Sequence, residues 1–227
     1  MKTTIKALLL VAIVALSYLC IMSIMTPIQF EKERAFRERA VVQALIDLRT
    51  AQIEHRDQKG SFISDLDSLI HFVKTGTKMM VLKEGTLSDA QLASGLTETR
   101  AMQIIRRGNQ REITQAGLQN FRRDTTFQPL LEALYRGRHT KESLNNLKYI
   151  PFSDSVRFEM ETNDNFLGAN NRWIPLCEIR APFSAFLKDI NRQEALNLID
   201  LQRKLDRYPG LRAGSVVESN NFAGNWE

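Results

Sequence analysis

Between Lys6 and Glu31 the chain carries no charged residue, and this uncharged run constrains the fold more than any other feature. Its core, Ala7 to Met25, reads ALLLVAIVALSYLCIMSIM and is nearly all apolar. As a helix rising about 1.5 Å per residue it would span about 28 Å, close to the ~30 Å hydrocarbon core of a bilayer. The sequence therefore predicts one transmembrane helix at residues 7–25, with the lipid bilayer as its partner and residues 1–6 as a short tail.

Two other interpretations of this run are weaker. Ala15 to Ser17 has the small residues that signal peptidase accepts, but cleavage there would leave Tyr18 to Met25 as an exposed apolar terminus. A lipoprotein signal needs a small residue before Cys20, where this chain has Leu19. We therefore expect a retained anchor in which Cys20 is an ordinary apolar side chain.

Orientation depends on the basic residues that flank the anchor. Lys2 and Lys6 cluster with the terminal amine and favour a cytoplasmic N-terminus, whereas the basic residues between Lys32 and Arg39 argue for the opposite sense. We give the first cluster more weight and expect a single-pass protein of the inner (cytoplasmic) membrane. Its N-terminus is then cytoplasmic, and its domain is periplasmic if the source is Gram-negative.

Beyond the anchor, Pro27 permits a bend, and Glu31–Gln58 has the pattern of an amphipathic helix. Val41, Leu45 and Leu48 recur at positions i, i+4 and i+7, which places them on one helical face. We expect this face to pack on the sheet described below and not to meet solvent.

Shorter elements follow this helix. Lys78–Lys83 is β-prone, Leu87–Arg107 has helical spacing closed by Gly108, and Pro129–Tyr135 predicts a further helical turn or two. Before them, the spacing Ser64-x-x-Asp67 matches a capping box and predicts a short helix. The residues expected on the inner face of that short helix are Leu66, Leu69, Ile70 and Val73.

The strands lie in the C-terminal half. Val156–Glu161 is the clearest one, because apolar and charged residues alternate along it. Trp173–Ala181 is predicted as its antiparallel partner, with Pro175 favouring a sheet edge and Thr162–Arg172 as the connecting loop. Leu211–Val217 is expected to form a last short strand.

Between these strands, Asn191 is expected to cap a helix whose inner face carries Leu198, Leu201 and Leu205. The polar segment 218–227 is expected to be loose, and no repeat or linker divides the rest of the chain. The sequence therefore predicts an α+β fold. It has a single transmembrane helix and one extracytoplasmic domain over residues 26–217, in which the amphipathic helix packs on a small antiparallel sheet with further helices.

Residues with catalytic or metal-binding chemistry are scattered. Asn163–Gly168 begins like an EF-hand loop, but Leu167 and Ile174 stand where calcium ligands should be, so an Asn-rich hairpin loop is the simpler interpretation. Cys177 lies in a predicted strand and is expected to be an inert buried thiol. The histidines, none with a second ligand at zinc spacing, are His55, His71 and His139. We expect no metal, no cofactor and no enzymatic activity.

One charge feature stands out, a set of six arginines between positions 100 and 123. They could form an anion-binding face for lipid headgroups, acidic polysaccharide or an acidic partner, although a solvated helix face followed by a loop is the favoured interpretation. Nucleic acid is disfavoured by the exported orientation and by the single interleaved aromatic residue, Phe121. The arginine set consists of Arg100, Arg106, Arg107, Arg111, Arg122 and Arg123.

The order of parts resembles the N-terminal half of type IV pilins and of the pseudopilins of type II secretion. The similar residues are the apolar helix at the start, a proline just beyond it, and VVQALIDLRTAQIEHRDQKGSFISDLDSLIHFV with its Lys-Gly-x-Phe turn. The chain lacks the Gly before a Phe-Thr-Leu-Ile-Glu start that a prepilin peptidase would cut. Further on, RRDTTFQPLLEALY and YPGLRAGSVVESNNFAGNWE are similar to membrane-anchored proteins of the Bacteroidetes group.

The pilin resemblance implies a long helix packed on a C-terminal antiparallel sheet, and it implies self-association or protein partners. We therefore expect a non-enzymatic component of cell-envelope assembly, pseudopilin-like in secretion or filament formation. Small residues in the anchor, Ala7, Ala12, Ala15 and Ser23, would let helices approach closely in the bilayer. The alternative is an anchored periplasmic module that binds an anionic ligand or partner through the arginine set.

Overall fold

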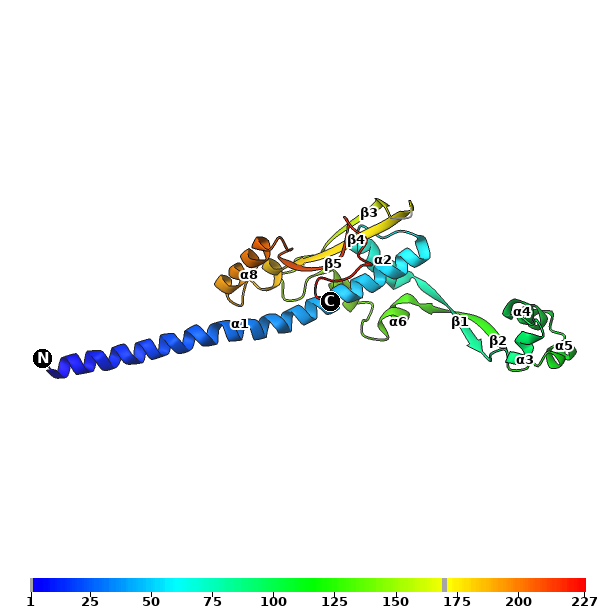
Figure 1. The fold of residues 1–227 in the computed structure, drawn as a ribbon, viewed down its shortest axis with the longest axis horizontal. Coiled ribbons are helices and arrows are strands. Elements are labelled where there is room, and N and C mark those ends of the chain that lie inside the picture. The colour runs from blue at the N-terminus through cyan, green and yellow to red at the C-terminus, as the bar shows by residue number, and fades with distance from the viewer. Residues whose placement is uncertain (1, 169–170) are drawn as a thin grey trace. The chain divides into compact units, whose positions relative to one another are not determined.

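A computed structural model describes residues 2–168 and 171–227 of the chain (Figure 1). Helices make up 53% and strands 18% of it, and the strands form small antiparallel sheets, which confirms the mixed helix and sheet class. The helices are α1 (Lys2–Lys59), α2 (Leu66–Thr75), α3 (Asp89–Ala93), α4 (Glu98–Arg107), α5 (Gln110–Gln115), α6 (Leu130–Tyr135), the 3-10 helix η1 (Ser143–Lys148), α7 (Phe183–Phe186) and α8 (Arg192–Lys204). The strands are β1 (Thr77–Glu84), β2 (Arg122–Pro129), β3 (Glu159–Leu167), β4 (Trp173–Pro182) and β5 (Gly210–Ser215).

The chain divides into two compact units. Unit 1 joins Met1–Phe72 to Arg138–Glu227, and unit 2 is the intervening segment Val73–Gly137. Residues 26–217, the range of the expected extracytoplasmic domain, include parts of both units, and that domain remains a prediction. Composition does not reveal the first boundary because it lies inside α2, where the helical pattern continues without a linker.

In unit 1, α1 is one helix of 58 residues that passes through Pro27. Proline lacks the N–H that would bond the carbonyl four residues earlier, and its ring crowds that carbonyl. Next to it, the Thr26 hydroxyl donates a 2.7 Å hydrogen bond to the Met22 carbonyl and holds the same turn together. The anchor segment and the amphipathic segment therefore form one continuous rod in place of two helices.

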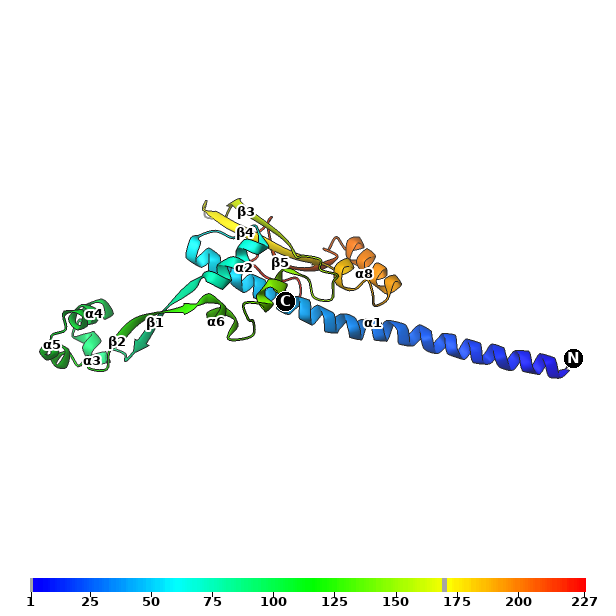
Figure 2. The same cartoon turned by 180° about the vertical axis from the view of Figure 1, so that it is seen from behind.

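The second half of α1 lies along the sheet of unit 1 (Figure 2). Val41, Leu45 and Leu48 are completely buried, which confirms the predicted inward face. Next to them Gln52, also fully buried, donates to the Ile63 carbonyl at 2.6 Å and contacts the Met160 sulfur at 3.0 Å. This half of α1 is therefore the core helix of unit 1.

The sheet has the order β3-β4-β5, and both pairs are antiparallel. The predicted β3–β4 hairpin is confirmed, but β3 begins three residues later than expected and continues to Leu167, into the segment expected as a loop. Val156 lies before the strand and is exposed. β4 is the central strand, not an edge. Pro175 is tolerated there because it lies beyond the end of the β5 pairing and opposite the register shift between Asn163 and Phe166.

The C-terminal segment 218–227 is docked and not loose. It follows the free edge of β5, where Gly214 N–H donates to the Ala223 carbonyl at 2.9 Å and Asn225 N–H donates to the Arg212 carbonyl at 3.0 Å. Phe222 is buried and packs edge-on against Phe62. The tail thus covers a sheet edge that would otherwise expose backbone donors and acceptors.

α8 begins as predicted, with the Asn191 side chain accepting hydrogen bonds from the N–H groups of Gln193 and Glu194. Its inner face differs from the expectation. Ala195, Leu198 and Ile199 are buried, whereas Leu201 and Leu205 are each 52% exposed. Leu201 lies about 60° around the helix from Leu198, at the margin of the buried face, and Leu205 follows the last helical residue.

α2 starts one residue later than the predicted capping box implies. The Asp65 carboxylate, not Ser64, accepts the hydrogen bond from the Ser68 N–H at 2.8 Å. The side chains predicted to face inward, Leu66, Leu69, Ile70 and Val73, are all buried. The spacing of apolar residues therefore predicted the buried face of α2 correctly, whereas the capping-box pattern misplaced its first residue by one position.

Unit 2 is built on the antiparallel ribbon of β1 and β2 and carries three short helices, α3 to α5, between the strands. A small apolar core of Ala101, Leu118 and Phe121 holds these helices together. The single helix expected over Leu87–Arg107 is two helices, because Gly95 adopts a φ of +81° and Thr97 caps the second piece. Gly108 is the left-handed C-cap that was predicted.

Candidate functional site

The N-terminal half of α1 is the most distinctive surface of the chain. Its apolar side chains are exposed, for example Leu8 at 74% and Ile24 at 63%. By length and composition, this is a helix that could cross a membrane. Soluble proteins rarely expose a continuous apolar surface of this size without a partner or a lipid phase to cover it.

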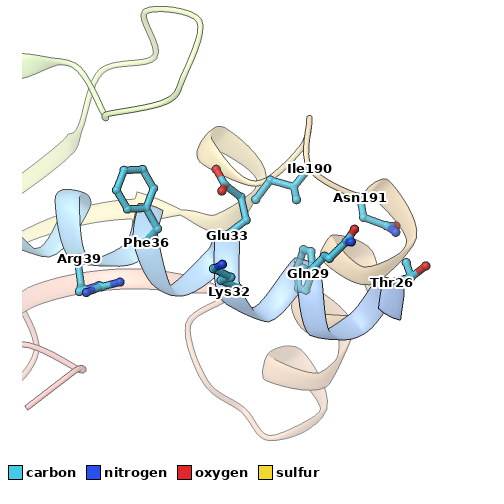
Figure 3. A pocket seen from close by; sticks show the side chains of 9 residues that line it. Thr26, Gln29, Lys32, Glu33, Phe36, Arg39, Ile190 and Asn191 are labelled. Atoms are coloured by element: carbon cyan, nitrogen blue, oxygen red, sulfur yellow. The ribbon is translucent and has the colours of Figure 1, made fainter. Parts of the chain in front are cut away.

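Where the apolar half ends, a groove of about 650 Å³ lies between α1 and the segment leading into α8 (Figure 3). We call it the foot groove. Phe30, Phe36 and Ile190 contribute apolar surface to it. The remaining lining residues are polar, namely Thr26, Gln29, Lys32, Glu33, Arg39 and Asn191.

Arg37 connects α1 to the loop beside this groove. Its guanidinium binds Asp189 at 2.6 Å, donates to the Phe186 carbonyl at 2.8 Å, and binds Glu33 on its own helix at 3.0 Å. The hydrogen bond from Arg37 holds the pKa of Asp189 below its ordinary value. The one acid that lines the foot groove, Glu33, is therefore already paired.

The neighbouring acids are also paired, whereas the bases of the groove are not. Arg34 binds Glu31 at 3.1 Å and Glu38 at 2.8 Å. Lys32 makes no ion pair within the described part of the chain, and Arg39 donates only to the Ala35 carbonyl of its own helix. The foot groove therefore presents positive charge.

The structure places the arginine set entirely in unit 2. Arg100, Arg106 and Arg107 are on α4, Arg111 is on α5, and Arg122 and Arg123 open β2. The side chain of Arg123 lies outside the described residues. Seven residues apart on one helix, Arg100 and Arg107 share a face.

The arginines differ in their surroundings. Arg100, Arg106, Arg107 and Arg111 are exposed and form no ion pair with any residue whose side chain is described. Arg122 has an interaction partner and stands opposite Glu84 in the ribbon. Four of the six arginines are thus exposed on two neighbouring helices, without an ion pair to any described side chain.

Buried polar groups in unit 1 satisfy one another. Asp47, 2% exposed in the middle of α1, binds Arg138 at 2.9 Å and His139 at 2.9 Å and accepts from Gln43 at 3.1 Å. Such a paired, buried acid holds two chain segments together. Removing a partner from such a buried ion pair is strongly destabilising.

Cys177 is buried, and burial raises the pKa of its thiol to about 12. The predicted burial is confirmed, and a thiol that stays protonated at neutral pH is a poor nucleophile and a poor metal ligand. Across residues 2–168 and 171–227, no group of three His, Cys, Asp or Glu side chains gathers as a metal site would require.

Sequence reasoning missed the Asp47 cluster and the foot groove. A lone acid between the buried Leu45 and Leu48 was a signal for the first, since such a position needs a basic partner. The groove gave no local signal, because its two walls lie more than 150 residues apart in the chain.

Comparison of this chain with protein families, with curated proteins and with solved structures found no match.

Proposed function

We propose that this chain is a non-enzymatic assembly component of the cell envelope, anchored in the inner membrane by the first half of α1 and pilin-like in its layout. The observation that carries the proposal is the continuity of α1. One uninterrupted helix has an exposed apolar half and a half that is the core of unit 1. Because the helix is continuous, a displacement of the anchor in the membrane would move unit 1 with it.

Orientation in this proposal follows the basic residues at the start. Lys2 and Lys6 keep the N-terminus in the cytoplasm, and unit 1 lies on the periplasmic side of a Gram-negative membrane. The helix-on-sheet layout supports the pilin-like interpretation, since pilins also pack half of a long helix on an antiparallel sheet.

Assembly would proceed by contacts between anchor helices. Ala12, Ala15 and Ser23 fall on one face of α1, where small side chains allow close approach between helices in a bilayer. Ala7, also expected to contribute, has a side chain outside the described residues.

Disulfide cross-linking in intact cells tests this role. In a Cys20→Ser background, Ala15→Cys should give a cross-linked product through the anchor, with another copy or with an envelope protein. Ser17→Cys, a similarly small residue on the opposite face, serves as the matched control and should give little. Equal cross-linking from both faces, or none from either, would contradict the assembly role.

A second function is favoured by four exposed arginines of unit 2 that make no ion pair with any side chain the structure describes. They fit an anionic ligand such as an acidic polysaccharide. Arg106→Glu with Arg107→Glu should then abolish retention on a sulfated polysaccharide column, and retention by the unchanged protein should weaken steeply with salt. Arg203→Glu with Lys204→Glu, another adjacent basic pair at a helix end, is the matched control. Equal losses from both pairs would rule out a specific site.

A further inference from the structure

The foot groove presents hydrogen-bond donors to whatever occupies it. The side chains of Lys32 and Gln29 make no hydrogen bond with any residue whose side chain the structure describes. Asn191 uses its carbonyl oxygen to cap α8, and no described residue accepts from its amide NH2. Figure 3 shows these three side chains around the same opening. Because the acid that lines the groove is paired with Arg37, the opening is suited to an anion.

Position along α1 indicates which anion can reach the groove. If the apolar run ends at Met25 on the bilayer surface, a rise of about 1.5 Å per residue puts the backbone of Lys32 about 10 Å above that level. The headgroup layer is about 5 to 8 Å thick on each side of the hydrocarbon core. A lysine side chain can bend toward that layer while its methylene groups cover apolar surface.

The apolar part of the groove fits the same occupant. Ile190 lies beside Glu33, and Phe36, which is 53% exposed, lies farther from Thr26 and the anchor (Figure 3). Within unit 1, α8 is at the end toward the N-terminal half of α1 (Figure 1). A phospholipid has an anionic phosphate joined through a glycerol, with its carbon atoms and ester oxygens, to apolar acyl chains, and so offers groups for both kinds of wall.

We infer that the foot groove binds the headgroup of an anionic phospholipid from the membrane that holds the anchor. Lys32 would contact the phosphate, Gln29 and Asn191 would donate to phosphate or glycerol oxygens, and Ile190 would contact the carbon atoms of the glycerol. This inference rests on the proposed membrane anchor. The inference adds two properties that an anchor alone does not require. The protein would prefer anionic lipid, and unit 1 would lie in contact with the bilayer surface.

Lipid retention by the full-length chain tests the inference. The protein is reconstituted with equal amounts of phosphatidylglycerol and phosphatidylcholine, extracted in mild detergent, and the retained lipids are counted by native mass spectrometry. Phosphatidylglycerol should be retained in preference to phosphatidylcholine. Lys32→Gln should lower that retention about fivefold, the effect of one basic residue near an anionic surface.

Lys59→Gln is the matched control, because Lys59 is an exposed lysine at the far end of the same helix and makes no ion pair with any described side chain. It lies about 50 Å from Met25 along α1, beyond the reach of the surface potential. Lys59→Gln should leave retention unchanged. Equal retention of both lipids, equal loss in both variants, or a Lys32→Gln effect only on dimer formation would overturn the inference.

A second readout separates failure of the inference from failure of the anchor. A fluorophore at Gln193→Cys, in a Cys20→Ser background, should be quenched by headgroup-labelled lipid, whereas one at Asp164→Cys on β3 should not. A chain that stays in carbonate-washed membranes but has an unquenched Gln193 position keeps its anchor and lacks the contact of unit 1 with the bilayer surface. A chain released by carbonate has no membrane anchor, and both proposals fail together.

Discussion

Replacement of Leu45 by alanine tests whether the second half of α1 is the core of unit 1. The Leu45 side chain is completely buried, so its burial is worth about 1.5 to 3 kcal/mol in transfer free energy. Truncation also leaves a cavity, because α1 is held against the sheet by further contacts on both sides of this position. Buried leucine to alanine changes typically cost about 2 to 5 kcal/mol in total. We expect Leu45→Ala to lower the free energy of unfolding by about 3 kcal/mol.

The assay is urea unfolding of the chain shortened to residues 26–227, followed by far-ultraviolet circular dichroism. The shortened chain keeps Phe30, which is buried, and loses the exposed apolar segment. Leu196→Ala on α8 is the control, because Leu196 is 45% exposed and its truncation should cost well under 1 kcal/mol. A loss below about 0.5 kcal/mol for Leu45→Ala would mean that α1 is a detached stalk, and the reasoning would fail.

Three further outcomes follow from other contacts. Arg37 lowers the pKa of Asp189, so that as pH falls this carboxylate is protonated in the unfolded state before it is protonated in the folded state. Asp189→Asn should therefore lower the free energy of unfolding by up to about 1 kcal/mol at pH 7. In unfolding curves measured at decreasing pH, the difference between the two proteins should vanish as pH falls through the lowered pKa. Phe222→Ala should cost about 3 kcal/mol in the same urea assay if the C-terminal tail is docked, and no loss would indicate a loose tail. The Cys177 thiol, with a pKa of about 12, should resist maleimide at pH 7 in the folded protein and react after denaturation; rapid labelling of the native state would refute its burial.

Features that depend on local pattern were predictable from sequence. The apolar run, the stripe of Val41, Leu45 and Leu48, and the Asn191 and Gly108 caps all follow from spacing within a few residues. The β3–β4 hairpin was predictable for the same reason, since alternation reports a half-buried strand.

Features that depend on distant contacts were not predictable. Phe222 and Glu227 look like a polar tail in sequence, yet Arg49 of α1 donates to the Phe222 carbonyl at 3.2 Å and binds Glu227 at 2.6 Å. The strand order made β4 central despite Pro175, because β5 does not extend that far. The sequence also gave no signal for the two units, since α2 continues through the boundary.

The arginine set illustrates a further limit of sequence reasoning. Proximity along the chain suggested one basic face, but short helices with separate caps present these side chains from α4, α5 and β2. A run of basic residues in the sequence does not specify which way each side chain faces. That direction depends on where each helix begins and ends.

Protease accessibility tests the central claim, that the first half of α1 spans the membrane and holds unit 1 outside the cytoplasm. Protease is added to spheroplasts and, in parallel, to inverted inner-membrane vesicles, after carbonate washing has established that the full chain is retained. We expect digestion of unit 1 in spheroplasts, with a short membrane fragment left behind, and protection of unit 1 in inverted vesicles. Release of the intact chain by carbonate, or digestion of unit 1 only in the inverted vesicles, would contradict the account.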